Sequence, residues 1–143
     1  VLLNMSHHLT VEGVRRAHVV SDTALFFQGT QSIELRKVHI DFFDLQGRKT
    51  STLTSREGTY WWRTGRMQAR GNVVMVRGDG GTLRTEVVNY DQNKDEVSSD
   101  LPFTFDAPDR HVQGRGFVSD PNFRDVRAKQ PTARGGAFVL PNQ

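Results

Sequence analysis

The segment LTSREGTY at residues 53–60 decides the fold class, because its pattern occurs three times in the chain. An aliphatic residue is followed by a small residue two positions later, by a small or branched residue three positions after that, and by an aromatic residue after two more. Residues 19–26 (VVSDTALF) and 83–90 (LRTEVVNY) keep this order. Seven residues after each aromatic comes another apolar residue, namely Ile33, Met67 and Val97. An internal repeat of this length predicts repeated supersecondary units.

Each copy is interpreted as one β-hairpin. A strand would leave past the aromatic residue, turn, and continue as the next strand from the apolar residue. The two-residue spacer between the small positions breaks strict alternation, which predicts a bulge or a twist in every copy. A degraded fourth copy has these members: Val112, Gly114, Phe117 and Val126.

The rest of the chain also predicts an all-β fold. Val38, Ile40 and Phe42 alternate with polar residues, as expected for a strand with one buried face, and no long segment keeps a helical period. Stacked hairpins leave two open sheet edges, at the first and the last strand. We expect one domain over residues 1–130 and a tail containing proline and glycine over 131–143. Turn signals separate the apolar runs at Gln28-Gly29-Thr30, Gln46-Gly47-Arg48, Thr64-Gly65, Gly78-Asp79-Gly80-Gly81 and Asp91-Gln92-Asn93.

Composition excludes several functions. The chain has 143 residues and no cysteine, so disulfides, thiolate metal sites and cysteine nucleophiles are ruled out. The formal net charge of +3 mildly favours an anionic partner, whether nucleic acid, phospholipid or phosphorylated glycolipid. The sequence contains no run of 18 apolar residues, the length needed to span a bilayer.

Catalytic and metal-binding motifs are missing from the sequence. There is no nucleophile elbow, HExxH or Walker motif, and we expect neither an enzyme nor a cofactor. The glycine-rich residues 78–81 are interpreted as a hairpin turn. His7 and His8 would point to opposite faces of a strand, so they are poorly placed to share a metal ion. We therefore expect no metal site.

Two binding functions remain open from the residues alone. Tyr60-Trp61-Trp62, beside Arg63, Arg66 and Arg70, could stack bases or bind a polyanionic glycan, although acidic residues are interspersed and a strand with alternating aromatics explains the same pattern. Alternatively, small residues beside large apolar ones could line a lipid-sized cavity, although ordinary core packing also fits.

Over residues 9–127 the chain resembles the LptC family, periplasmic components of the lipopolysaccharide export system. Part of the pattern is shared with LptA and OstA-type domains. The matching elements, in order, are Leu9-Thr10-x-x-Gly13, Ser21-Asp22-x-Ala24, Gly71-Asn72-Val73-Val74, Leu83-x-Thr85 to Tyr90-Asp91, Ser98-Ser99-Asp100 and Gly114-x-Gly116-Phe117.

The resemblance implies a twisted, open β-jellyroll of antiparallel strands that does no covalent chemistry. It implies that lipopolysaccharide acyl chains lie in an apolar groove. The partners it implies are the jellyroll domains of the inner-membrane ABC transporter at the N-terminal edge and an LptA-like protein at the C-terminal edge. Members sit in the periplasm on an N-terminal membrane helix, which this chain does not include. A soluble LptA-like bridge unit and a homodimer are the alternatives, and nucleic acid is not expected.

The resemblance also assigns residues to sites. The lipid-binding candidates are Ala24, Phe26, Ile40, Phe42, Tyr60, Met67, Val88, Tyr90, Phe103, Phe105 and Phe117. The partner-binding candidates are Gly13, Val14 and Arg15 at the first edge and Phe123, Arg124, Val126 and Arg127 near the last strand, which is expected within residues 123–129. Candidates for contact with lipid A phosphates are Arg63, Arg66, Arg70 and Arg77.

Overall fold

A computed structural model describes residues 2–11, 14–78, 80–121 and 126–131. Within those residues the chain forms nine strands and no helix. The strands are β1 (Leu2–Val11), β2 (Val14–Phe27), β3 (Ser32–Phe43), β4 (Lys49–Trp61), β5 (Arg66–Arg77), β6 (Thr82–Asp91), β7 (Glu96–Ala107), β8 (Arg110–Ser119) and β9 (Arg127–Pro131).

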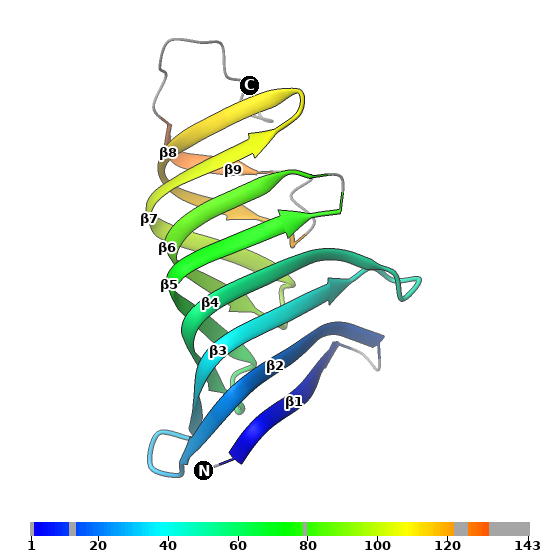
Figure 1. Cartoon of the computed structure of the whole chain (residues 1–143), viewed down its shortest axis with the longest axis vertical. Coiled ribbons are helices and arrows are strands. Elements are labelled where there is room, and N and C mark those ends of the chain that lie inside the picture. Colours follow the sequence, from blue (N-terminus) through cyan, green and yellow to red (C-terminus); the bar gives the residue numbers. More distant parts are fainter. Residues whose placement is uncertain (1, 12–13, 79, 122–125, 132–143) are drawn as a thin grey trace.

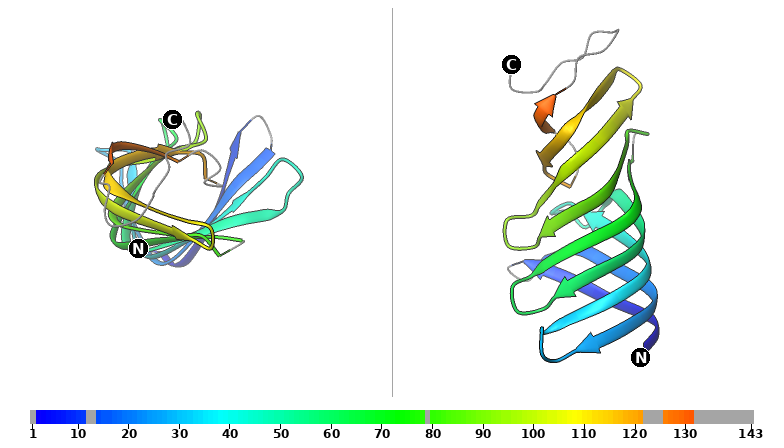
Figure 2. Two further views of the ribbon diagram at one scale, coloured as in Figure 1. Left: turned by 90° about the horizontal axis from the view of Figure 1, so that it is seen from above. Right: turned by 90° about the vertical axis from the view of Figure 1, so that its left-hand side faces the viewer.

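All nine strands belong to one antiparallel sheet, in which spatial order follows chain order. The sheet rises from β1 to β9 in Figure 1, and viewed along this axis it curls around its apolar side without closing into a barrel (Figure 2). The expected all-β, open jellyroll is confirmed. Its two edges are β1 and β9. Pro131 of β9 pairs with Gly114 of β8, so the last strand runs one residue into the segment that was expected to be a tail.

The sequence repeat reflects the register in which the strands of each hairpin pair. Phe26 pairs with Ile33 across the β2–β3 turn, and Tyr60 pairs with Met67 across the β4–β5 turn. Tyr90 pairs with Val97 in the same way. The seven-residue step is therefore the distance around each turn, and the hairpin interpretation is confirmed.

The small positions of the repeat mark a crease that runs across the sheet. At mid-strand the register shifts by one residue in four successive pairs, from β4–β5 to β7–β8. Buried hydroxyl groups lie at the crease and form hydrogen bonds with the backbone where the pairing of neighbouring strands is interrupted. Ser55 Oγ donates to the Glu57 carbonyl at 2.9 Å, and Thr85 Oγ1 donates to the Pro102 carbonyl at 2.9 Å. These bonds satisfy carbonyls that would otherwise be buried without a partner.

Backbone conformation supports the crease. Lys37, Gly71, Asn72 and Gly116 all have positive φ at the crease, at 55°, 84°, 49° and 81°. Glycine and asparagine tolerate this region better than other residues, which accounts for the Gly71-Asn72 pair in the family-like GNVV element. Register shifts accompany the second and third copies of the repeat, as expected, whereas the β2–β3 pairing of the first copy shows no shift. Each long strand bends over and contributes to two layers.

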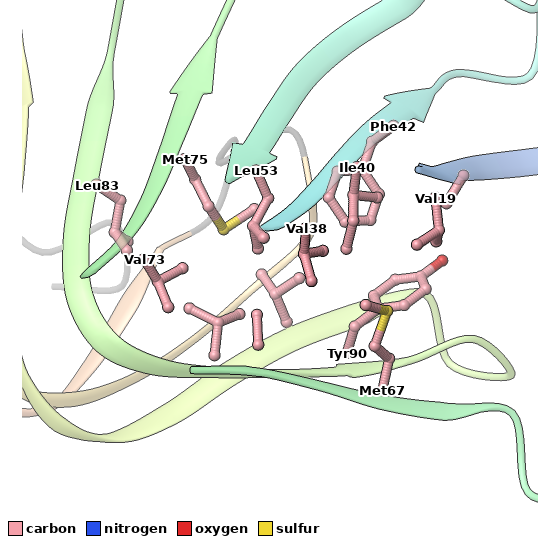
Figure 3. Close-up of a cluster of buried hydrophobic side chains, with 14 of the residues drawn as sticks. Val19, Val38, Ile40, Phe42, Leu53, Met67, Val73, Met75, Leu83 and Tyr90 are labelled. Atoms are coloured by element: carbon pink, nitrogen blue, oxygen red, sulfur yellow. The ribbon is translucent and has the colours of Figure 1, made fainter. Parts of the chain in front are cut away.

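The two layers face each other across the apolar interior. Layer A comprises residues 14–20, 38–43, 49–54, 73–77, 82–85, 102–107 and 110–115; layer B comprises residues 24–27, 32–36, 57–61, 66–70, 87–91, 96–99 and 116–119. Phe42 of layer A meets Tyr90 of layer B edge-on, with ring centroids 5.1 Å apart. Figure 3 shows Tyr90 and Met67 facing Val38, Ile40 and Phe42 across this interior. The interior is packed with apolar side chains rather than hollow.

Candidate lipid-binding groove

Most lipid-binding candidates line the interior between the layers. Nine are buried: Ala24, Ile40, Phe42, Met67, Val88, Tyr90, Phe103, Phe105 and Phe117. Tyr60 is partly buried and packs against the same cluster. These positions therefore form one continuous apolar interior that follows the long axis of the roll.

Phe26 is the exception, because 48% of its surface is exposed. It lies on the inner face in the row Phe26–Ile33–Tyr60–Met67. Exposure is 48% at Phe26, 9% at Ile33 and 2% at Met67, with Tyr60 partly exposed between the last two. The expectation that Phe26 is interior is wrong in this respect, since it stands where the inner face is uncovered.

The exposure of Phe26 follows from an offset between the layers. Phe42 in β3 covers Tyr90 in β6, and Ser51 Oγ in β4 donates to the Pro121 carbonyl just beyond β8, at 2.6 Å. Layer A strands therefore lie over layer B strands that come several places later in the sheet. Near the β2–β3 turn the inner face of layer B is left uncovered at Phe26. Trp62 partly fills this space, with its ring 6.4 Å from that of Phe26.

Residues 91–95, here called the strap, cross from layer B to the first hairpin. Asp95 forms an ion pair with Arg16 of β2, and Tyr90 Oη donates to Asp95 Oδ1 at 2.9 Å. Gln92 Nε2 donates to the carbonyl of Thr10 in β1. Burial and the Asp95 carboxylate raise the pKa of Tyr90 far above its ordinary value, so its hydroxyl stays protonated and acts as a donor.

The strap is fixed to layer B by a second set of bonds. The Gln92 N–H donates to the Gly65 carbonyl at 2.9 Å, and Asn93 Nδ2 donates to the Thr64 carbonyl at 2.9 Å. The contacts of Arg16 and Thr10 with the strap therefore link layer A to layer B on the open side of the roll. The strap thus crosses the open side of the interior.

Trp61 and Trp62 lie in different surroundings. Trp62 packs against the core cluster, whereas Trp61 lines an outer hollow of about 570 Å³ with Arg66, Gln68 and Asn89. Gln68 and Asn89 alternate with the buried Met67 and Tyr90, so they belong to the outer face of layer B. The aromatic triplet therefore divides between core and exterior, as the alternating-strand interpretation predicts.

The four arginines that were candidates for phosphate contact do not gather at one place. Arg70 donates to Glu34 Oε2 at 3.1 Å and to Thr59 Oγ1 at 2.8 Å on the outer face of layer B. Arg66 lies 3.9 Å from Asp91, and Arg63 donates to Gln31 at 3.3 Å in the turn region. Arg77 stacks on Phe105, with its guanidinium carbon 5.5 Å from the ring centroid.

Some of the partner-binding candidates lie in an edge strand or in the strand next to it. Val14 and Arg15 open β2 and pair with Val11 and Thr10 of β1. Arg127 is exposed and begins β9. Val126 is buried in the core rather than at the surface. Gly13, Phe123 and Arg124 lie outside the described residues.

Sequence reasoning missed Arg16 and the strap. Arg16 and Asp95 are 79 positions apart, and no spacing rule links them. Only the offset of the layers brings the two side chains together. The described residues contain no group of three side chains that could hold a metal ion. They also contain no helix long and apolar enough to cross a membrane.

The fold defines the chain as an open antiparallel β-roll with two free edges and an apolar interior. The model of the family "Lipopolysaccharide-assembly, LptC-related" matches residues 5–127, so the chain belongs to that family and the resemblance is confirmed. A similar solved structure is the crystal structure of LptH from Pseudomonas aeruginosa, described as the LptA homologous periplasmic component of the conserved lipopolysaccharide transport device. It superposes with a TM-score of 0.61 over 88% of this chain and 89% of that one, at 14% identity, which shows a shared fold. No curated protein matches the sequence.

Proposed function

We propose that this chain is a non-enzymatic periplasmic component of the lipopolysaccharide transport bridge. In this role it receives lipopolysaccharide from the inner-membrane ABC transporter and passes it to an LptA-like protein, while an N-terminal helix outside this sequence tethers it to the inner membrane. Family membership supports the general role. The observation that carries the proposal is the apolar interior, which runs from the exposed Phe26 to the buried Phe117.

Shielding acyl chains is physically worthwhile. Each methylene exposed to water costs about 0.8 kcal/mol, so a chain of a dozen carbons needs an apolar path along its whole length. The interior supplies such a surface, but its side chains are packed against each other. Acyl chains would therefore enter by separating the layers on the side that the strap crosses, replacing side-chain contacts with lipid contacts.

The two sheet edges are the docking surfaces in this proposal. An edge strand carries unpaired backbone groups that can add a strand from a partner. The β1 edge would meet the transporter, with the candidates Gly13, Val14 and Arg15 taking part, and a partner there would also cover Phe26. The β9 edge, with Arg127, would meet the LptA-like protein. A homodimer through either edge is the competing arrangement.

Photocrosslinking tests the lipid proposal. A photoreactive amino acid at Phe103 points into the interior, and one at the adjacent Thr104 points outward as the matched control. With purified lipopolysaccharide we expect adducts at residue 103 at least tenfold more often than at residue 104. Equal labelling at the two positions, in variants that keep the β-rich circular dichroism spectrum, would show that the interior is a permanent core.

A second experiment tests the first edge. Gly13→Arg should weaken co-purification with the transporter complex, because a bulky side chain obstructs close strand pairing. Binding of the LptA-like protein should remain unchanged and serves as the internal control. Loss of both interactions, or of neither, would contradict the assignment of this edge.

A further inference from the structure

Arg16 has more hydrogen-bonding capacity than its surroundings use. Its Nη2 atom pairs with Asp95 Oδ2, and both side chains are mostly buried, with 19% and 23% of their surface exposed. Its Nε atom is buried and has no hydrogen-bond partner within the described part of the chain. A guanidinium carries five N–H donors in a fork that matches carboxylate and phosphate oxygens in pairs. A buried donor without an acceptor is costly, so this arrangement suits an anion with more than one oxygen.

Asp95 is a replaceable partner for this guanidinium. It belongs to the strap and has a φ of 52°, a conformation that costs a non-glycine residue free energy. Its other oxygen accepts from Tyr90 Oη, which is itself part of the inner face. Asp95 thus holds the position of an anion where the strap crosses the open side of the interior, a place here called the mouth. Its backbone conformation would relax if the strap moved away.

We propose that Arg16 binds a phosphate group of the transported glycolipid, and that Asp95 occupies this site until the phosphate displaces it. The inference rests on the proposed function, and it names the headgroup chemistry that opens the roll. A phosphate with two or more oxygens can engage Nε and an Nη atom together, which the single contact from Asp95 does not do. Displacement removes the Arg16–Asp95 link between the layers beside the place where acyl chains enter.

Location and burial favour Arg16 over the other arginines for this role. Arg70 is engaged by Glu34 and Thr59 on the outer face, away from the apolar interior. Arg63 and Arg66 are exposed, and water screens exposed charges strongly. Arg16 lies at the mouth, mostly out of water, where its attraction for an anion is greater.

The test compares bisphosphorylated lipid A with its fully dephosphorylated form, each dispersed in the same detergent. We expect wild type to bind the phosphorylated form at least tenfold more tightly. Arg16→Gln should reduce this ratio to about one, while Asp95→Asn should raise affinity for the phosphorylated form severalfold more than for the dephosphorylated form. Arg36→Gln is the matched control, because it removes the same charge from an exposed position outside the phosphate candidates, and it should keep the wild-type ratio.

Three outcomes would overturn the inference. An unchanged ratio in Arg16→Gln would show that the phosphate binds elsewhere, and unaltered affinity in Asp95→Asn would show that Asp95 does not compete. Asp95→Asn leaves Arg16 in place, so it tests the site even if Arg16→Gln unfolds. Inorganic phosphate that binds wild type as tightly as lipid A would mean a site for the free ion. Failure of the proposed function is distinct, because then neither form of lipid A labels residue 103.

Discussion

The ring of Phe42 meets the ring of Tyr90 edge-on, with centroids 5.1 Å apart and planes at 68°. Phe42 belongs to β3 and Tyr90 to β6, so this contact joins strands that do not pair within the sheet. Edge-to-face aromatic pairs add about 0.5–1.5 kcal/mol beyond the burial of their surface. The contact therefore holds the two layers together at the centre of the roll, just inside the strap.

Phe42→Ala should be strongly destabilising. Removing a buried phenylalanine typically lowers the free energy of unfolding by about 3–5 kcal/mol, because a cavity remains. Phe27→Ala is the control, since Phe27 is 46% exposed and its loss should cost less than about 1 kcal/mol. Urea denaturation followed by circular dichroism measures both. Similar losses in the two variants would contradict the assignment of Phe42 to the interlayer core.

Ser55→Ala tests the crease. The hydroxyl of Ser55 bonds the Glu57 carbonyl at 2.9 Å, and its removal leaves that oxygen short of a partner. We expect a loss of about 1 kcal/mol in the free energy of unfolding. Ser55→Thr is the matched control, because the third copy of the repeat carries Thr85 at this position and keeps the hydroxyl. Equal stability of the alanine and threonine variants would contradict a role for this bond.

A crosslink across the strap should prevent lipid entry. The chain contains no cysteine, so the pair Thr10→Cys and Gln92→Cys introduces the only two thiols. Joining them by a disulfide or a short bifunctional reagent should lower lipopolysaccharide labelling of residue 103 at least tenfold, and cleaving a disulfide link should restore it. The control pair Thr64→Cys and Asn93→Cys joins two turns within layer B and should leave labelling unchanged. Undiminished labelling in the first crosslinked pair would show that the strap does not move.

His111 supplies a prediction about pH. The hydrogen bond that His111 donates to the Asp106 carboxylate raises the pKa of His111 above its ordinary value, and the bond to Gln113 adds to this. Since the folded state holds the proton more tightly, the stabilisation is present below about pH 6.5 and is lost as pH rises through the folded pKa. Both side chains are exposed, so it amounts to at most about 1 kcal/mol.

An NMR titration of wild type and Asp106→Asn measures this effect. The pKa of His111 should fall toward about 6.5 in the variant. Asp109→Asn removes a neighbouring charge without removing the hydrogen bond, so it should lower the pKa less. An equal fall in both variants would mean that charge alone, not the hydrogen bond, raises the pKa.

The sheet could be predicted from the sequence because its decisive signals are local. Phe26 and Ile33, like Tyr60 and Met67, are separated by a single turn, so their spacing shows directly in the chain. Burial of most candidates followed from the same alternation. Phe26 was misjudged because its exposure depends on which strand of layer A lies above it, and no local pattern contains that information.

The mouth of the roll could not be predicted for the same reason. Arg16 and Asp95 meet only because the layers are offset by several strands, which depends on how far every crease bends the sheet. The resemblance suggested basic residues for phosphate contact, and Arg63, Arg66, Arg70 and Arg77 were the candidates. In the structure these four are dispersed, and the arginine beside the strap is a different one.

The crease recurs in the second and third copies of the repeat, each with its own hydroxyl and its own aromatic residue, and this has a consequence for the evolution of such proteins. The copies begin at residues 19, 53 and 83, and each contributes one stretch of wall on either side of the bend. Duplicating one copy would lengthen the roll without requiring a new corner, since each repeat contacts chiefly its neighbours. The distance that such a protein spans is therefore set by a count of gene segments, and selection can adjust it in whole steps while the fold stays the same.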